Sequence, residues 1–279
     1  MRTHLVIPDT QIKPGVPLEH LSWIGRYIVK RKPDVIVHLG DHYDFPSLSY
    51  YDRGKLSFEG RRYKADIRAG HEALDILEGP LNAYNQERKE RKEKQYKPEK
   101  HYILGNHEER ANRAAQDNPE LSGLVGTEEI TEYWEARDWN VHKFQHVADI
   151  DGVWYVHYVA NPMTGKPLGG MVETRLKNVG NSFTMGHVQT LMHGIRYVGR
   201  KQQHGLVAGS CYLHDEDYKG PSSHESMISG NHHWRGIIVK HQVEDGSYDP
   251  MFVSLDYLCR EYEGIRLNEF MMRRYGLGA

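Results

Sequence analysis

The first half of the chain alternates short β-branched runs with longer segments of helical periodicity, and this alternation constrains the fold more than any other feature. Strands are predicted at residues 5–8, 34–39 and 101–104. Apolar residues at helical spacing occupy 17–32, and an amphipathic stretch covers 59–81. Strands that alternate with helices in this way are typical of βαβ units and a parallel sheet.

Each of these three predicted strands stops at a cluster of polar residues. The clusters are DTQ at 9–11, GDHYD at 40–44 and GNHE at 105–108. In a parallel sheet, the loops after successive strands emerge along one edge, where ligands bind in open α/β folds. We therefore expect the three clusters to meet at one edge of the sheet.

The second half of the chain is richer in short strands, and it carries two further polar clusters. Helices are predicted at 108–117, 127–137 and 170–178, and strands at 147–150, 153–158, 183–185, 190–198, 205–208, 236–243 and 251–255. The dipeptide Asp151-Gly152 is a strong signal for a two-residue hairpin turn. The polar clusters are His157 in WYVHY and GHVQ at 186–189. We expect residues 147–158 and the later strands to form a second sheet.

The chain contains no Pro/Ser-rich linker, which favours one domain over independent modules. We expect a single domain over residues 1–279. Within it, we expect a helical, charged insertion around 59–100 and a β-rich C-terminal extension from about residue 200. The charged run at 87–100 alternates in sign, which is typical of a solvated helix face.

Composition excludes several classes of protein. The 36 Lys and Arg against 38 Asp and Glu give a net charge of −2, so no global basic field attracts a polyanion. No apolar run approaches the ~20 residues of a spanning helix, and the N-terminus lacks the apolar core of a signal peptide. Two cysteines cannot build a disulfide framework or a thiolate zinc cluster. We therefore expect a cytoplasmic protein that does not contact membranes.

The residue types in the five polar clusters point to metal chemistry. Asp, Asn, Gln and His supply oxygen and imidazole donors for divalent cations, and the chain has 18 His. Asp41 is the best candidate for a bridging ligand, because one carboxylate can hold two cations about 3.5–4 Å apart. The sequence thus predicts a dinuclear metal site.

The order of these motifs resembles that of the calcineurin-like metallophosphoesterase superfamily. Its members carry DxH, GDxxD, GNHD or GNHE, a lone His and then GHxH, and the resemblance here runs from Asp9 to Gln189. It implies an α/β fold, the βα sandwich, in which two mixed β-sheets pack together and are flanked by helices. It also implies a metal-dependent phosphoester hydrolase.

The resemblance implies a role for each matching residue. One metal would be held by Asp9, Gln11, Asp41 and Gln189, and the second by Asp41, Asn106, His157 and His187. His107 would be the general acid, with Glu108 hydrogen-bonded to its other ring nitrogen. Asp44 would brace the loop.

The chain departs from the family pattern at Gln11 and Gln189, where the family usually has His, and both changes fall on the same metal. Two carboxylates and two amide oxygens form a hard donor set that suits Mn²⁺ or Mg²⁺ better than Zn²⁺. We therefore expect two divalent ions, with Mn²⁺ favoured and Mg²⁺, Fe or Zn²⁺ as alternatives. The ion on the glutamine side should exchange readily.

The resemblance implies attack on phosphorus by a metal-bridging hydroxide while His107 protonates the leaving alkoxide. This favours a phosphodiesterase; its substrate would be a nucleic acid, which makes it a nuclease, or a small diester. The alternative is a binding or scaffold module with weak or lost catalysis, which Gln11 and Gln189 favour and the intact GNHE motif opposes. Arg196, Arg200 and Lys201 follow GHVQ, and they form either a clamp for the substrate phosphate or a basic hairpin exposed to water.

Overall fold

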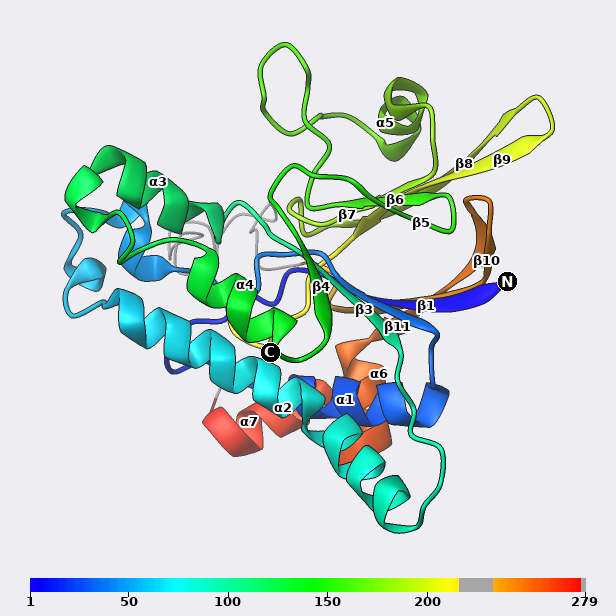
Figure 1. Ribbon diagram of the computed structural model, residues 1–279, viewed down its shortest axis with the longest axis horizontal. Coiled ribbons are helices and arrows are strands. Elements are labelled where there is room, and N and C mark those ends of the chain that lie inside the picture. Colours follow the sequence, from blue (N-terminus) through cyan, green and yellow to red (C-terminus); the bar gives the residue numbers. More distant parts are fainter. Residues whose placement is uncertain (216–232, 277–279) are drawn as a thin grey trace.

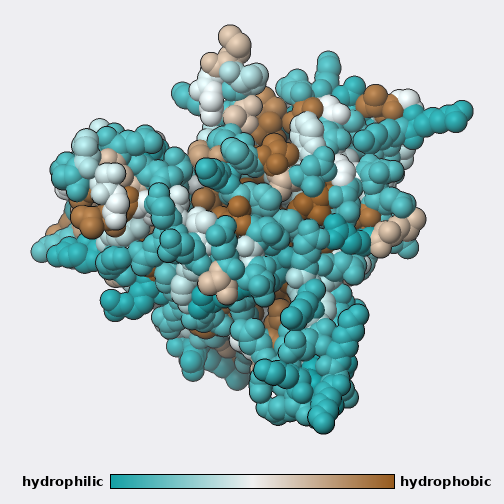
Figure 2. Space-filling model, viewed as in Figure 1, coloured by the Kyte–Doolittle hydropathy of each residue, from teal (hydrophilic) through white to brown (hydrophobic). Residues whose placement is uncertain are grey.

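The computed structural model describes residues 1–215 and 233–276. Two mixed β-sheets pack face to face and helices cover their outer surfaces, which gives the α/β sandwich expected from the sequence (Figure 1). In the described residues, no helix has both the length and the apolar composition needed to cross a membrane. The face shown in Figure 2 is mostly hydrophilic.

The first sheet has six strands in the order β11-β10-β1-β2-β3-β4. Its strands are β1 (Arg2–Ile7), β2 (Val35–His38), β3 (Glu99–Ile103), β4 (Trp139–His142), β10 (Gly236–Glu244) and β11 (Ser247–Ser254). Strands β1 to β4 are parallel, whereas β10 and β11 are antiparallel to their neighbours. Most residues of β1, β2 and β3 are buried, because both faces of the sheet are covered.

The second sheet has five strands in the order β5-β6-β7-β9-β8. They are β5 (Ala148–Ile150), β6 (Val153–Val156), β7 (Phe183–Met185), β8 (Leu191–Val198) and β9 (Lys201–Ala208). Strands β5 and β6 form the hairpin predicted around Asp151-Gly152, and both turn residues have positive φ angles, of 52° and 79°.

Helices lie outside the two sheets (Figure 1). The helices are α1 (Glu19–Arg31), α2 (Tyr63–Glu90), α3 (Glu109–Asp117), α4 (Glu128–Glu135), α5 (Val172–Val179), α6 (Leu255–Glu263) and α7 (Leu267–Tyr275), and four short 3₁₀ turns cover Pro46–Leu48, Tyr50–Asp52, Leu56–Phe58 and Pro119–Leu121. Helix α1 ends where Lys32 adopts a left-handed conformation before Pro33. Helix α2 fills most of the segment predicted as a charged helical insertion.

Three layers of apolar side chains hold the sandwich together. Val6 and Val37 of the first sheet pack with Tyr155 and Leu206 of the second sheet in the layer between them. A larger cluster fills the space between the first sheet and helices α1, α2, α6 and α7. The third cluster lies between the second sheet and α5. The inner layer fixes the two sheets relative to one another, so loops from both sheets share one edge.

The expectation that all late strands join the second sheet is wrong for β10 and β11. Strand β10 pairs with β1 in the first sheet, with Leu5 opposite Val239 and Val6 opposite Ile238. Its continuous apolar run fits a central strand of either sheet, so periodicity alone does not choose the partner. Helices α6 and α7 were not predicted either. The chain after residue 200 therefore contributes to both sheets.

Candidate metal centre

The polar clusters from the two sheets meet at one edge of the sandwich. The loops that follow β1, β2 and β3 carry Asp9, Asp41 and Asn106, and the loops after β6 and β7 carry His157 and His187. The backbone N–H of His187 donates to both carboxylate oxygens of Asp9, at 3.1 and 3.0 Å, across 178 residues of sequence. The predicted convergence is therefore present in the structure.

Two glycines of the motifs allow backbone and carboxylate to approach each other closely. A Cβ at Gly105 would lie 2.2 Å from Oδ1 of Asp41, and a Cβ at Gly186 would lie 2.2 Å from Oδ1 of Asp9. Both distances are far below van der Waals contact. Any other residue at these two positions would push a carboxylate out of the site.

Four of the candidate ligands adopt a backbone conformation that is rare for residues with a side chain. The φ angles of Gln11, Asp41, His187 and Gln189 are 49°, 47°, 64° and 62°. Left-handed non-glycine residues cost about 1–3 kcal/mol each and cluster at functional sites. The strain is thus concentrated on the loops that bring the candidate ligands together.

Asp41, His157 and His187 form a compact group of potential metal donors, in which one ligand atom from each residue lies within 4.8 Å of the others. His157 Nδ1 donates to the carbonyl of Leu39 at 2.7 Å, which directs Nε2 into the site. Nε2 then lies 3.3 Å from Asp41 Oδ1 and 2.9 Å from Asn106 Oδ1. Two oxygens and a ring nitrogen face one another, and a cation between them would satisfy all three.

The electrostatics of this group also favour a positive charge. Burial disfavours the imidazolium of His157, but the carboxylates of Asp41 and Asp9 outweigh burial and raise the pKa of His157 to about 9. Burial would raise the pKa of Asp41, yet His107 and His157 hold it far below its usual value. Burial and the carboxylate of Asp41 raise the pKa of Asp9 to about 7, against the lowering effect of His157. Two buried carboxylates side by side are unfavourable without cations.

The glutamine side of the site contains an unsatisfied acceptor. Gln11 Nε2 lies 3.3 Å from Asp41 Oδ2, while its Oε1 is buried and has no hydrogen-bond partner among the described residues. Gln189 Oε1 accepts a hydrogen bond from the hydroxyl of Tyr212 at 2.9 Å. A buried amide oxygen without a donor is costly, and a bound hard cation would satisfy Gln11. The residues present therefore fit divalent metal ions.

His107 lies beside the metal-ligand group and is held by Asp44. Its Nδ1 lies 2.8 Å from Asp44 Oδ1, and its Nε2 accepts a hydrogen bond from Arg110 Nη2 at 2.9 Å. Nε2 is also 3.8 Å from Asp41 Oδ2. Burial lowers the pKa of His107, but Asp41 and Asp44 more than compensate, so the net shift is upward.

The expectation that Glu108 contacts the second ring nitrogen of His107 is wrong. The Glu108 carboxylate accepts hydrogen bonds from the backbone N–H groups of Asp41, Tyr43 and Gly105 and from the hydroxyl of Tyr102, at 2.7–3.0 Å. Glu108 begins the turn into α3, so its side chain lies under the loops after β2 and β3 rather than beside the imidazole. It ties those two loops together, and burial raises its pKa.

The structure does not bring the predicted basic residues to the site. Strand β8 starts beside the GHVQ loop and runs away from it, and the hairpin projects from the sandwich (Figure 1). Arg196 lies within β8 opposite Gln203, and Arg200 and Lys201 are exposed at the far turn. Of the two readings of this segment, the exposed basic hairpin matches its position.

Sequence reasoning missed Arg110, which contacts both residues of the His107–Asp44 pair. Its Nη1 donates to the backbone carbonyl of Asp44 at 2.7 Å. The sequence feature that could have identified Arg110 is its position three residues after His107, at the start of a predicted helix. This spacing puts the two side chains on one side of the helix turn. Tyr212, the partner of Gln189, lies in a loop and carried no signal.

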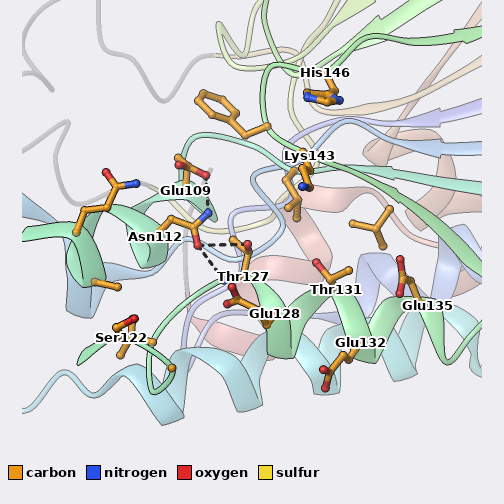
Figure 3. A pocket seen from close by; sticks show the side chains of 17 residues that line it. Glu109, Asn112, Ser122, Thr127, Glu128, Thr131, Glu132, Glu135, Lys143 and His146 are labelled. Carbon is orange, nitrogen blue, oxygen red and sulfur yellow. Dashed lines mark hydrogen bonds between the residues drawn. The ribbon is translucent and has the colours of Figure 1, made fainter. Parts of the chain in front are cut away.

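A cleft of about 770 Å³ lies between α3, α4 and the segment after β4 (Figure 3). We call it the acidic cleft. Four carboxylates line it, those of Glu109, Glu128, Glu132 and Glu135. Asn112 accepts hydrogen bonds there from the backbone and hydroxyl of Thr127 and donates to Glu109. The sign of this charge disfavours a phosphate-rich strand in the cleft.

Comparison with known proteins identifies one family. The family model described as calcineurin-like phosphoesterase matches residues 4–205. A solved crystal structure is similar to this chain with a TM-score of 0.34 and 13% identity, over 91% of this chain and 99% of the other. None of the curated proteins matches the chain.

Proposed function

We propose a phosphodiesterase activity from one premise: the chain belongs to the calcineurin-like phosphoesterase family. Membership implies metal-dependent hydrolysis of phosphoesters. The finer proposal is a dinuclear enzyme that cleaves a phosphodiester and releases an alcohol. The single observation that carries it is the position of His107, whose Nε2 faces the buried donor group at 3.8 Å from Asp41 while Nδ1 is held by Asp44.

The donor groups divide into two sets around Asp41. Asp9, Gln11 and Gln189 would hold one ion together with Asp41, and Asn106, His157 and His187 would hold the other. The chemistry that such ions supply when bound is Lewis-acid stabilisation of phosphoryl oxygens and activation of water. The amide and carboxylate oxygens of the first set support Mn²⁺ as the preferred ion.

The protein's own residues position the proton that the leaving group needs. Asp44 accepts the Nδ1 proton of His107, so the second proton of an imidazolium would sit on Nε2, in place of the hydrogen bond that Nε2 accepts from Arg110 in this structure. An alkoxide leaves poorly without protonation, and a positioned acid typically contributes roughly 10²–10⁴-fold. His107 would therefore matter most for diesters of ordinary alcohols.

The charges of the protein favour a small diester over a long nucleic acid as the substrate. The net charge is −2, and the cleft of about 770 Å³ beside α3 presents four carboxylates. A polyanion would gain little there from counterion release. Nuclease activity on a short or single-stranded end remains part of the proposal, to be separated by assay.

The second candidate function is a binding module without catalysis. One observation favours it: Oε1 of Gln189 already accepts a hydrogen bond from Tyr212, so this ligand position is engaged within the protein. The distinction rests on turnover, because a scaffold would bind metal and phosphate without releasing alcohol.

The test uses metal-stripped protein reloaded with Mn²⁺, Mg²⁺ or Zn²⁺. Hydrolysis of bis(4-nitrophenyl) phosphate and of the methyl ester of thymidine 5′-phosphate is measured for wild type, Asp41→Asn and His107→Asn, with Arg200→Gln as a surface control. We expect activity with Mn²⁺, loss of metal and of activity in Asp41→Asn, and retained metal in His107→Asn. Equal rates in wild type, Asp41→Asn and His107→Asn would leave only the binding module.

The methyl ester isolates the role of His107. Its leaving methoxide needs a proton, whereas 4-nitrophenolate does not, so His107→Asn should lose more activity on the methyl ester by about 10²-fold. Undiminished hydrolysis of that ester by His107→Asn would reject the assignment of the general acid.

A further inference from the structure

A small basic pocket opens beside the GNHE loop on the side opposite the acidic cleft. Its volume is about 180 Å³, and its walls are Leu48, Tyr50, Arg53, Arg110, Arg113, Ala114 and Asp117. We call it the arginine pocket after its three guanidinium groups. With one carboxylate against three guanidinium groups, the pocket carries a positive charge. At ~30 Å³ per water, it has room for roughly six waters.

Two arginines connect the arginine pocket to the proposed catalytic group. Arg110 donates one hydrogen bond to His107 Nε2 at 2.9 Å and another to the carbonyl of Asp44 at 2.7 Å. Arg113 Nη2 donates to the carbonyl of Asn106 at 3.2 Å. Arg110, a wall of the pocket, thus contacts the nitrogen that would protonate the leaving oxygen. A leaving alcohol at His107 would therefore lie next to a guanidinium group of the pocket.

Helix α3 separates charges of opposite sign onto its two faces. Arg110 and Arg113 are three residues apart and line the arginine pocket, whereas Glu109 and Asn112 line the acidic cleft (Figure 3). With 3.6 residues per turn, this spacing places each pair on its own face. An anionic group next to the site is therefore attracted to one side of α3 and repelled from the other.

We propose that the arginine pocket binds a second phosphate, carried by the leaving alcohol of the substrate. The inference rests on the phosphodiesterase function proposed above and specifies its substrate class, a diester whose leaving group is itself phosphorylated. Guanidinium groups suit this ligand because their planar N–H pairs match two phosphate oxygens. Leu48 and Ala114 add apolar side chains to the lining of the pocket.

The arginines differ in how they serve as test positions. Arg110 touches His107, so replacing it would disturb the proposed acid as well as the pocket. Arg53 and Arg113 are exposed, and neither makes a hydrogen bond or ion pair with His107 in the part of the chain that the structure describes. The informative variant is therefore the double change Arg53→Gln and Arg113→Gln. Arg200→Gln removes one positive charge at the far end of the β8–β9 hairpin and serves as the control.

The experiment measures binding without turnover. Titration calorimetry on Mn²⁺-loaded protein compares propyl phosphate with the bisphosphates of ethane-1,2-diol, propane-1,3-diol and butane-1,4-diol. We expect one spacer length to bind about tenfold tighter than propyl phosphate, which is the effect of roughly one charge-assisted hydrogen bond. The preference should vanish in Arg53→Gln/Arg113→Gln and persist in Arg200→Gln. The same preference in wild type and the double variant, or none in wild type, would overturn the proposal.

Two further arms identify the source of the second phosphate and separate this proposal from the previous one. Oligothymidylate that outcompetes thymidine 5′-phosphate through Arg53 and Arg113 would identify a nucleic-acid strand, whereas a gain limited to the bisphosphates would identify a small ester. Either result supports the pocket. A protein that hydrolyses no diester but keeps the arginine-dependent preference would contradict the phosphodiesterase function alone.

Discussion

The carboxylate of Asp44 lies 2.8 Å from Nδ1 of His107, and this contact sets which ring nitrogen faces the site. Asp44 is itself held by Lys13 and Arg110, each with a nitrogen 3.7 Å from a carboxylate oxygen. Burial would raise the pKa of Asp44, but the contact with His107 keeps it below its usual value. Asp44 therefore stays ionised and fixes both the tautomer and the orientation of the imidazole.

Replacing Asp44 with Asn should lower kcat by about 10–100-fold, the usual effect of removing a partner that orients a functional His. The amide can still accept from Nδ1 but no longer stabilises the charged ring. The loss should be larger for an alkyl leaving group than for 4-nitrophenolate, a difference that a purely structural defect would not produce. Steady-state kinetics with both esters provides the measurement.

Asp52→Asn is the matched control for Asp44. Asp52 lies in the same loop region but contacts Lys55 and Arg61 rather than His107. Its replacement should leave the ratio of the two rates unchanged. Equal losses on both esters in Asp44→Asn would contradict a positioning role for Asp44.

Glu108 should matter for stability rather than for proton transfer. Its buried carboxylate accepts from four donors, and Gln at this position would turn an N–H₂ group toward two of them. An unsatisfied buried donor costs about 1–3 kcal/mol, so Glu108→Gln should lower the free energy of unfolding by about 2–4 kcal/mol. Urea unfolding of the metal-free protein measures this directly.

Glu109→Gln is the neighbouring control, because Glu109 accepts one hydrogen bond, from Asn112, and is half-buried. We expect a change below about 0.5 kcal/mol. A Glu108→Gln variant as stable as Glu109→Gln would mean that the loops after β2 and β3 are held by other contacts.

Gln11→His should shift the metal preference toward Zn²⁺. Oε1 of Gln11 is buried and has no hydrogen-bond partner among the described residues, and an imidazole there would replace a hard oxygen donor with a borderline nitrogen. We expect more zinc retained after dialysis and a smaller advantage for Mn²⁺ in activity. Gln86→His, on the exposed part of α2, adds a histidine away from the site and should change neither quantity. Identical metal content in the two variants would mean that Gln11 does not bind the metal.

Local patterns in the sequence were sufficient to predict a parallel sheet and the edge at which the clusters meet, whereas the two-sheet sandwich was implied by the family resemblance. The polar residues Asp9, Asp41 and Asn106 follow apolar runs, and this change in polarity marks the end of each strand. The family match confirms the resemblance. The order of the strands within the two sheets was harder to predict from the sequence. Whether β10 pairs in the first or the second sheet depends on contacts across more than 230 residues, which no local period records.

The partner of His107 shows the same limit at the scale of side chains. The family resemblance assigned this contact to Glu108, the neighbour of His107 in sequence, yet Asp44 reaches the ring from 63 residues away. A one-residue step along a tight turn points side chains in different directions, so adjacency did not imply contact. Arg110 was missed for a related reason, since its role depends on which helix face borders the site.

The stability of the protein should depend on pH through Asp66, a residue of α2 outside the metal centre. Asp66 accepts from the backbone N–H of Ser47 at 3.1 Å, and its residue exposure is 1%. Burial, which outweighs the bonds from Ser47, raises the pKa of Asp66 to about 6. Because this value lies above the unfolded value of 3.8, the folded protein holds the proton more tightly than the unfolded chain. The stabilisation is complete below pH 4 and is lost as the pH rises through 6.

Asp66→Asn keeps the acceptor oxygen but cannot ionise, so it should remove this loss. Relative to the variant, the wild-type metal-free protein should lose about 2–3 kcal/mol of unfolding free energy between pH 4 and pH 7.5, at 1.36 kcal/mol per pKa unit. Urea unfolding of both proteins across this range measures the difference, in which the other titrating groups cancel. Asp75→Asn is the control, because Asp75 is exposed on the same helix and pairs with Arg137. Parallel pH profiles for wild type and Asp66→Asn would mean that Asp66 ionises in the folded protein at its ordinary pKa, with water reaching its carboxylate.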